Sequence, residues 1–300
     1  MAGLFAWISN RLDPGRSVED LARWLKIEVA DLQSVEPNYT TFRIPKRSGG
    51  FRTIEAPDER LKEVQRLILR RVLGGLKAHP CALGFERGRS IVTHAQAHVG
   101  KALVIRLDLV DFFPNTQADR VLEYFRSIGW NRRAAQLLVK LTTNNRHLPQ
   151  GAPTSPRLTN LVNYKMDARL LAMARKVGGT DATYTRYADD LTFSVAHEGE
   201  HTSRDIIRGA STIVRDTGYL LHRKKKTHIL RSHQRQTVAG LVVNDKVDLP
   251  RETRRWLRAV EHRERLGREA TLTPAQLSGW RSLRHMIDTQ RDPPARVRRR

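Results

Sequence analysis

Three aspartates occupy positions where a carboxylate needs a physical explanation. Asp189 and Asp190 stand side by side in Arg186-Tyr-Ala-Asp-Asp-Leu191, where apolar residues flank the predicted tight turn of a hairpin. Asp108 lies near the end of the apolar run 102–109, which has the length of a buried strand. An acid at the end of a buried strand costs free energy unless it is paired or binds a cation. An isolated pair of turn aspartates is usually only solvated, so the pair alone would not indicate a site.

Convergence of these three carboxylates would predict phosphoryl-transfer chemistry. A cluster of acids repels a phosphate-bearing substrate unless divalent cations lie between them. Mg²⁺ suits this position because it is a hard cation that carboxylates and substrate phosphates commonly share. Two such ions, with Mn²⁺ as a substitute, would activate a 3′-hydroxyl and stabilise a leaving pyrophosphate. This is the chemistry of a nucleotide polymerase.

The charge of the chain indicates a polyanionic partner. Its 300 residues include 54 Lys and Arg against 31 Asp and Glu, a formal net charge of +23. No acid occurs from Thr217 to Asn244, and the last fifty residues contain 14 Arg and 6 acids. Nucleic acid is the usual partner of such a surface, and arginine suits bidentate phosphate contacts. A charge that serves solubility or a membrane surface is the alternative.

Length and composition exclude several classes of protein. The chain is long enough for one to three domains with a sizeable core. No apolar stretch reaches the roughly 20 residues of a membrane-spanning helix. Cys81 is the only cysteine, which excludes a disulfide scaffold, and the N-terminus lacks the basic start of a secretory signal. We therefore expect a cytoplasmic protein without a membrane partner.

The residue patterns predict a mixture of helices and strands without a linker between domains. Gly74-Gly75 marks the end of one helix, and the segment 148–156, rich in Pro and Gly, separates two others. The expected elements are a helix from Ser17, a basic-tipped hairpin over 40–57, a helix over 61–72, a strand over 102–109, helices within 117–143 and 157–176, a strand–turn–strand over 183–195, a helix over 202–217, a strand over 238–243 and basic helices from 250.

Several ordered motifs together resemble the reverse transcriptases, and among these the bacterial retron enzymes. The motifs are Tyr187-Ala-Asp-Asp190, Asp108 about eighty residues upstream, and Leu148-Pro-Gln-Gly-Ala-Pro-Thr-Ser-Pro156 between them. The resemblance implies an α+β right-hand polymerase with an antiparallel-sheet palm, fingers and a helical thumb. The implied parts are an N-terminal helical segment (1–39), fingers (40–101), the first palm strand (102–114), fingers and palm helices (115–155), the palm with its hairpin (156–240) and a basic thumb (241–300).

The resemblance also assigns expected roles to the site residues. Asp108, Asp189 and Asp190 match the catalytic, metal-binding carboxylates, with Asp108 and Asp189 as the primary ligands. Phe113 matches the bulky residue beneath the incoming sugar, where an aromatic ring leaves no room for a 2′-hydroxyl. The other expected dNTP-binding residues are Lys46, Arg52, Asp111, Gln150, Gly151 and Lys226.

Basic residues outside the nucleotide site are expected to contact nucleic acid. Lys226 matches a lysine near the pyrophosphate, but its two lysine neighbours make Lys225 a competing assignment. The expected nucleic-acid contacts are Arg223, Lys224, Lys225, Arg254, Arg255 and Arg258.

Two weaker motifs resemble retron elements associated with RNA recognition. In Thr93-His-Ala-Gln-Ala-His98, His94 stands where the family usually has Asn. In Val238-Ala-Gly-Leu-Val-Val243, Ala239 replaces the usual Thr. The resulting candidates for RNA recognition are His94, His98, Val238 and Gly240. A zinc site at the two histidines is disfavoured because no third ligand is evident.

The resemblance implies a dedicated structured noncoding RNA as both template and primer. Synthesis would start from an RNA 2′-hydroxyl and leave single-stranded DNA joined to RNA. A host RNase H, an effector protein and a role in anti-phage defence follow from the same resemblance. Two alternatives remain at this point. One is a reverse transcriptase of group II intron, abortive-infection or CRISPR-associated lineage, and the other is a non-enzymatic RNA-binding protein.

Overall fold

The computed structural model of the chain describes residues 13–46, 49–222, 227–267 and 271–291. These residues form two compact units. Unit 1 holds 13–80, 110–168 and 214–220, and unit 2 holds the remaining described residues. No helix in the described ranges is both long and apolar enough to cross a bilayer. Residues 81–101, expected with the fingers, and the described part of 241–300 both belong to unit 2.

Unit 1 is a helical core with a two-stranded ribbon. The first helix among its described residues follows Ser17, as the sequence predicts, and the side chains of Ser17 and Asp20 cap each other's backbone N–H groups. Leu21, Leu61 and Phe125 are fully buried in the core that the helices share. The helices in the described part of unit 1 are α2 (Val18–Leu25), α3 (Val29–Gln33), α4 (Glu59–Arg71), α6 (Ala118–Ser127), α7 (Arg132–Thr142) and α8 (Ser155–Val162).

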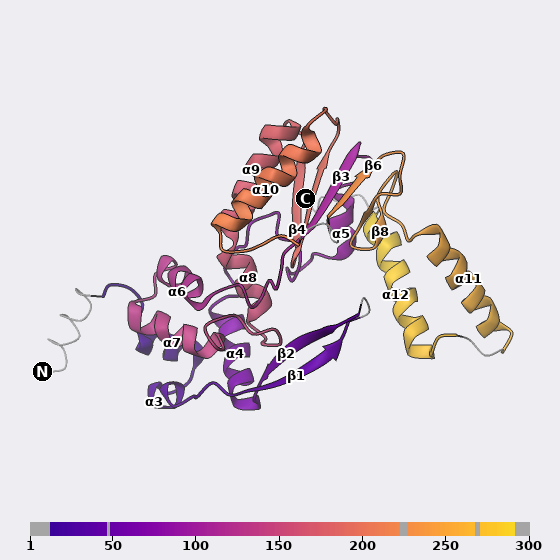
Figure 1. Ribbon diagram of the computed structural model, residues 1–300. Helices are drawn as coiled ribbons and strands as arrows, with labels where there is room; N and C mark the ends of the chain where they lie inside the picture. The colour runs from indigo at the N-terminus through magenta and orange to yellow at the C-terminus, as the bar shows by residue number, and fades with distance from the viewer. Residues whose placement is uncertain (1–12, 47–48, 223–226, 268–270, 292–300) are drawn as a thin grey trace, which may run out of the picture. The chain divides into compact units, whose positions relative to one another are not determined.

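The ribbon of unit 1 is the hairpin predicted over 40–57. Strands β1 (Tyr39–Pro45) and β2 (Phe51–Pro57) pair in antiparallel register, with Ile44 opposite Arg52 (Figure 1). Most of β1 is exposed, whereas the last residues of β2 are buried or half-buried. The ribbon therefore packs against the rest of unit 1 through the last residues of β2, which follow Arg52.

Unit 2 contains the antiparallel sheet that the resemblance implies. Its strands are β3 (Leu103–Asp108), β4 (Thr183–Tyr187), β5 (Asp190–Val195) and β6 (His228–Arg231), in the order β4-β5-β3-β6. The apolar residues of β3 are fully buried because it is a central strand. Residues 228–231 are too few for a recognisable alternation, which explains why β6 has no sequence signal.

Helices cover both faces of this sheet (Figure 1). Helix α9 (Tyr164–Gly178) reaches one face, where the side chain of Val195 leaves no room for a Cβ on Gly178. Helix α10 (Thr202–Asp216) packs beside α9 through Gly209 against Met173. On the other face, α5 (Ile91–Gln96) lies against β4, and its His94 also contacts Thr192 of β5. The segment expected as one helix over 157–176 is divided into α8 and α9 at Asn163.

The C-terminal part of unit 2 is helical, as expected. Helices α11 (Arg251–Arg265) and α12 (Pro274–Arg291) follow a short ribbon of β7 (Thr237–Val238) and β8 (Leu241–Val242). The single strand predicted over 238–243 is therefore wrong. Ala239 and Gly240 both have positive φ, at 48° and 82°, and this pair makes the tight turn that splits the segment into a hairpin.

Candidate functional site

The carboxylates meet at one end of the unit 2 sheet. Asp108 is the last residue of β3 and lies opposite Asp190, the first residue of β5, in antiparallel register. The N–H of Leu109 donates to the carbonyl of Asp189 at 3.0 Å, which ties the Tyr187–Asp190 turn to the strand end. The three positions that the resemblance assigns to the catalytic carboxylates are therefore neighbours in the fold.

His222 also contacts this group, and no motif in the sequence indicates that it would. Its backbone N–H donates to the carbonyl of Asp108 at 2.8 Å, and its Nε2 lies 3.4 Å from an Asp108 carboxylate oxygen. The side chain of Asp108 is only 13% exposed, against 38% for His222. Asp108 is thus half-buried, with its remaining accessible surface near an imidazole.

The donor chemistry of this group fits a hard divalent cation. Two carboxylates directly opposite on neighbouring strands repel each other, and a cation between them removes this cost. Among the described residues, no three His, Cys, Asp or Glu side chains gather into a ready-made metal cluster. Mg²⁺ is commonly bound by one or two carboxylates completed by water and substrate phosphates, so a protein cluster of three is not required. Asp108, Asp189 and Asp190 would be the residues to hold it.

Unit 1 contains the residues of the ribbon and of the 148–156 segment that are expected to bind the incoming nucleotide. The Glu55 N–H donates to the carbonyl of Gln150 at 2.9 Å, so this segment lies beside β2, three residues from Arg52. Gly151 has φ +141°, and a Cβ there would lie 2.7 Å from the carbonyl oxygen of Glu55. Glycine is therefore required at 151 both by its backbone conformation and by the close approach of β2.

Glu55 fixes this arrangement through its side chain. One carboxylate oxygen accepts from the Asn144 side chain at 2.6 Å, and the other lies 2.9 Å from His147 Nε2. Glu55 is only 9% exposed, and these two partners satisfy its buried oxygens. No sequence pattern indicates Glu55, because its partners are about ninety residues away along the chain. The ribbon carrying Arg52 is thereby held against the loop carrying Gln150 and Gly151.

Phe113 is positioned by a buried aromatic group in unit 1. It is half-buried and its ring lies 5.7 Å from that of Phe112, which in turn lies 5.5 Å from Tyr219. The Tyr219 hydroxyl lies 2.7 Å from the Thr116 hydroxyl and accepts from the Asn163 side chain at 3.0 Å. Asp111, three residues after Asp108, is exposed and has φ +40°. Tyr219 is a third residue, after His222 and Glu55, for which the sequence carries no signal.

The expected cationic residues are only partly described by the structure. Lys46 is exposed at the end of β1, where its backbone N–H donates to the carbonyl of Gly50 at 2.9 Å. Arg52 is exposed on β2. The remaining candidates of the 223–226 run lie outside the described residues: Arg223, Lys224, Lys225 and Lys226.

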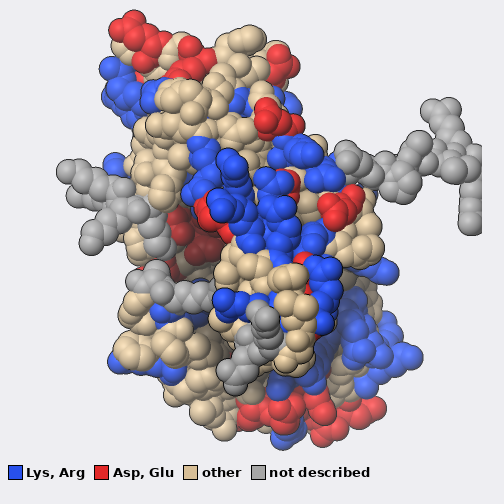
Figure 2. Space-filling model, turned by 90° about the vertical axis from the view of Figure 1, so that its right-hand side faces the viewer, with Lys and Arg blue, Asp and Glu red and all other residues tan. Residues whose placement is uncertain are grey.

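Helices α11 and α12 face each other across a basic cavity of about 400 Å³. Figure 2 shows the side that carries these helices, where Lys and Arg side chains gather. Among the described residues, Arg251 and Arg258 form no ion pair, whereas Arg254 pairs with Asp248 at 2.7 Å. Arg255 is exposed on the same helix but does not line the cavity. The arginines lining the cavity are Arg251, Arg254, Arg258, Arg284 and Arg291.

His94 and His98 are fully buried between α5 and the sheet. His98 Nδ1 lies 2.7 Å from the Ser194 hydroxyl and Nε2 lies 2.6 Å from the Thr185 hydroxyl. The Thr185 hydroxyl is also 2.9 Å from His94 Nδ1. Burial lowers the pKa of His94 to about 4 and that of His98 well below its usual range, and nearby positive charges act in the same direction. The lowered pKa values leave both histidines neutral near pH 7, and neither exposes an atom that RNA could contact in this structure.

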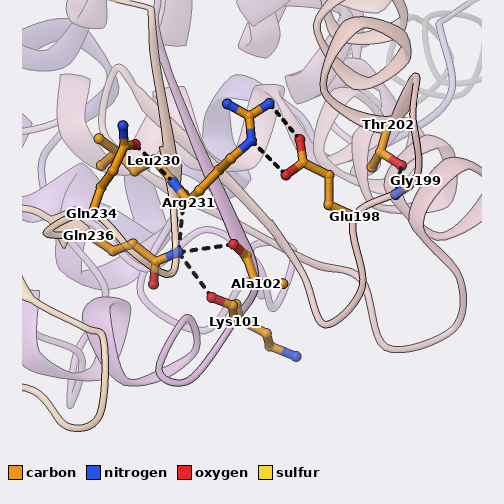
Figure 3. Close-up of polar contacts among 9 residues, drawn as sticks. All are labelled: Lys101, Ala102, Glu198, Gly199, Thr202, Leu230, Arg231, Gln234 and Gln236. Carbon is orange, nitrogen blue, oxygen red and sulfur yellow. Dashed lines mark hydrogen bonds and ion pairs between the residues drawn. The ribbon is translucent and has the colours of Figure 1, made fainter.

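The β7–β8 ribbon presents one of its two RNA-recognition candidates. Val238 is fully buried, whereas Gly240 is exposed at the turn. Gln236, one residue before the ribbon, holds it beside β3 and β6 (Figure 3). Its side-chain amide donates to the carbonyls of Lys101 at 2.9 Å and Leu230 at 3.0 Å. Arg231 of β6 forms two contacts of 2.9 Å with Glu198, which fixes the edge strand to the opposite loop.

Comparison with known proteins decides the family. Residues 44–257 match the family described as reverse transcriptase (RNA-dependent DNA polymerase). The chain is 37% identical to the Retron Mx65 reverse transcriptase of Myxococcus xanthus, over 92% of this chain and 69% of that protein. It is 31% identical to the Retron Ec86 reverse transcriptase of Escherichia coli, over 91% and 85% respectively. The chain belongs to the retron reverse transcriptases.

The fold of this retron reverse transcriptase is also found in solved structures. Telomerase from Candida albicans, in complex with a fragment of telomeric RNA, matches with a TM-score of 0.52 at 10% identity. That match covers 77% of this chain and 48% of the telomerase chain. The expected right-hand α+β fold is thereby confirmed, and the enzyme is an RNA-directed DNA polymerase.

Proposed function

We propose that this reverse transcriptase copies part of one dedicated structured RNA into single-stranded DNA, starting from a 2′-hydroxyl of that RNA. The observation that carries the proposal is the opposed pair Asp108 and Asp190, with Asp189 in the adjoining turn, in a chain similar to retron enzymes over most of its length. Template and primer in one folded RNA would require a protein with an extended basic surface, which the net charge of +23 supplies.

The carboxylates would act by holding two Mg²⁺ ions. Such a pair of ions lowers the barrier to phosphoryl transfer by stabilising charge on the attacking and leaving oxygens. Asp108, Asp189 and Asp190 are the residues proposed to bind them, and Mn²⁺ is the expected substitute. The protein's own contribution is to fix these oxygens at one sheet end and to keep them half-buried.

The residues of unit 1 would bind and select the incoming dNTP. Arg52 and Lys46 are proposed to grip the triphosphate, since a guanidinium binds phosphate oxygens in a bidentate manner. Gln150 and Gly151 would pack against the nucleotide, and Asp111 would border it. Phe113, with Phe112 and Tyr219 behind it, would exclude the 2′-hydroxyl of an rNTP. Outside unit 1, Lys226, with Lys225 as the alternative, would supply a proton to the leaving pyrophosphate.

The helices after residue 250 would contact the RNA–DNA duplex. Arg254, Arg255 and Arg258 are the proposed phosphate contacts, and the Arg223–Lys225 run would add to them. Such contacts fix the position of a duplex without reading its sequence, as a polymerase requires. A host RNase H, an effector protein, a cytoplasmic location and a role in anti-phage defence belong to the same proposal by analogy with retron systems.

One experiment tests the proposal directly. The protein is expressed with its neighbouring genomic sequence, and the copurifying nucleic acid is sequenced and treated with RNase A. We expect one RNA species carrying covalently attached DNA, whose mobility increases after RNase treatment. The double variant Asp189→Asn, Asp190→Asn should retain the RNA and lack the DNA. DNA synthesis by that variant, or copurification of many unrelated RNAs, would contradict the proposal.

A further inference from the structure

The turn that carries Asp189 and Asp190 is held by a segment outside the four-stranded sheet. Residues 81–84 run parallel to β4 and bond to Arg186 on both of its backbone groups. The Arg186 N–H donates to the carbonyl of Cys81 at 2.7 Å, and the Arg186 carbonyl accepts from Leu83 at 2.8 Å. Strand β4 therefore has a backbone partner on its outer side, one residue before the Tyr187–Asp190 turn.

Gly84 makes the closest approach to that turn. A Cβ at position 84 would lie 2.7 Å from the backbone nitrogen of Ala188 and 3.2 Å from the carbonyl carbon of Tyr187. Both neighbours are backbone atoms, which cannot rotate away as the end of a side chain could. The lack of a side chain at Gly84 thus lets this segment contact the turn backbone directly.

Arg186 contacts the same turn from inside the protein. Its side chain is fully buried, and its Nη1 donates to the carbonyl of Ala188 at 3.2 Å. Ala188 has φ +56°, a left-handed conformation that is uncommon for alanine. A residue in such a conformation persists when its surroundings determine it strongly, and strained backbone of this kind is concentrated at functional sites.

We propose that Gly84 and Arg186 are positioning residues for the catalytic carboxylates. Gly84 limits the outward movement of Ala188, and the Arg186 guanidinium holds the Ala188 carbonyl, so the peptide that precedes Asp189 has one orientation. Gly84 and Arg186 are both buried, so each would act on the reaction through the turn and not by touching substrate. The inference rests on the proposed role of Asp189 and Asp190. A displacement of about 1 Å at a reacting group can cost about a hundredfold in rate.

The first test compares Gly84→Ala with Gly75→Ala. Gly75 is the matched control because a Cβ there meets no atom within 4 Å and its φ is not positive. We expect kcat for dNTP incorporation to fall about 10- to 100-fold in Gly84→Ala, at an unchanged Kd for an RNA–DNA duplex. Gly75→Ala should match the parent enzyme. A Gly84→Ala variant with the parent kcat would overturn the proposal.

Two further readouts separate positioning from a general loss of folded protein. Mg²⁺ demands near-ideal octahedral geometry, so displaced carboxylates should impair Mg²⁺-supported synthesis more than Mn²⁺-supported synthesis. The ratio of the Mg²⁺-supported rate to the Mn²⁺-supported rate should therefore fall in Gly84→Ala. A smaller folded fraction would lower both rates equally and leave the ratio unchanged. Without any turnover, Mn²⁺ titrated into the protein and followed by electron paramagnetic resonance should bind more weakly. An unchanged ratio and unchanged Mn²⁺ affinity would identify the effect as merely structural and overturn the proposal.

The arginine is tested by rescue. Arg186→Lys keeps one charged donor for the Ala188 carbonyl, whereas Arg186→Met keeps only the apolar stem. We expect kcat of the lysine variant to exceed that of the methionine variant at least tenfold, and equal values in folded proteins would count against the role of Arg186. If Arg186→Met does not fold, the ratio of Mg²⁺-supported to Mn²⁺-supported synthesis is measured in Arg186→Lys. A change in the same direction as in Gly84→Ala supports the role of Arg186, and the parent ratio overturns it. Asp190→Asn, run in parallel, distinguishes the failures: activity in that variant defeats the proposed function itself.

Discussion

Asp108 and Asp190 lie directly opposite each other across β3 and β5, at the end of the sheet where both strands leave the core. Two carboxylates in this arrangement repel each other, and both are half-buried, so solvent screens them incompletely. The fold therefore accepts a local cost at the position proposed to hold the metal ions. Without a cation, removal of one of the two charges should relieve that cost.

The first prediction is an opposite effect of Asp190→Asn on stability and on activity. In EDTA, the variant should gain roughly 0.2–1 kcal/mol in free energy of unfolding, because the opposed like charges are gone. Its Mg²⁺-dependent dNTP incorporation should fall about a thousandfold, equivalent to several kcal/mol of transition-state stabilisation. Urea unfolding and single-nucleotide extension measure the two effects. Asp119→Asn, at an exposed aspartate paired with Arg146 on the surface, is the control and should change neither.

The second prediction concerns sugar selection. Phe113→Ala removes the ring that Phe112 and Tyr219 support, so rNTP incorporation relative to dNTP should increase by about 10- to 200-fold. The kcat/KM for dNTP should change much less, because exclusion acts on the 2′-hydroxyl alone. Competing dGTP and GTP on one template gives both values. Unchanged discrimination would show that another residue lies beneath the sugar.

The third prediction concerns Gly151. Alanine there needs φ +141° and would place its Cβ 2.7 Å from the Glu55 carbonyl oxygen. A strained residue costs about 1–3 kcal/mol, so the loop should move away from β2. We expect KM for dNTP to increase at least tenfold while duplex affinity stays the same. A parent-like KM in a folded Gly151→Ala enzyme would remove the loop from the nucleotide site.

The fourth prediction is loss of stability in acid from His94 and His98. The pKa of each is lower in the folded protein than in the unfolded chain, so the unfolded chain binds more protons as pH falls below about 6.5. The contribution of the neutral histidines to the free energy of unfolding is therefore present above that pH. It is lost progressively as pH falls toward 4. The urea midpoint should fall from pH 7 to pH 5, and His94→Gln should show a smaller fall. His201, an exposed histidine, is the control site: the urea midpoint of His201→Gln should fall between pH 7 and pH 5 by as much as that of the parent protein.

The sequence predicted those parts of the site that depend on local pattern. The apolar run before Asp108 and the alternation around Asp189 and Asp190 each indicate a strand. That these acids meet followed from the resemblance to reverse transcriptases, and the pairing of β3 with β5 brings Asp108 opposite Asp190. The hairpin under Arg52 was equally visible, because its basic Gly-Gly segment separates two runs rich in β-formers.

The parts that the sequence did not predict depend on long-range contacts. Glu55 and His147 are separated by 92 residues, and Thr116 and Tyr219 by 103, so no periodicity connects them. His94 and His98 match a motif associated with RNA recognition, but hydroxyls of Thr185 and Ser194 hold them inside the protein. Whether the side chains of His94 and His98 are exposed depends on hydrogen bonds to the sheet, and a sequence motif carries no information about those bonds.

The last prediction concerns the cavity between α11 and α12. Arg251 and Arg258 line it without a carboxylate partner among the described residues, so each is available to neutralise a phosphate. Loss of one phosphate contact lowers the slope of log affinity against log salt by about 0.9 for a duplex. We expect Arg251→Ala and Arg258→Ala each to reduce the slope by about this amount and to weaken binding similarly across sequences. Arg204→Ala on α10, where the exposed arginine pairs with Asp205, is the control and should leave the slope unchanged. Fluorescence anisotropy of an RNA–DNA duplex between 50 and 200 mM salt, the range over which phosphate contacts dominate affinity, measures it. If Arg251→Ala and Arg258→Ala keep the same salt slope as the Arg204→Ala control, the duplex does not bind at this cavity.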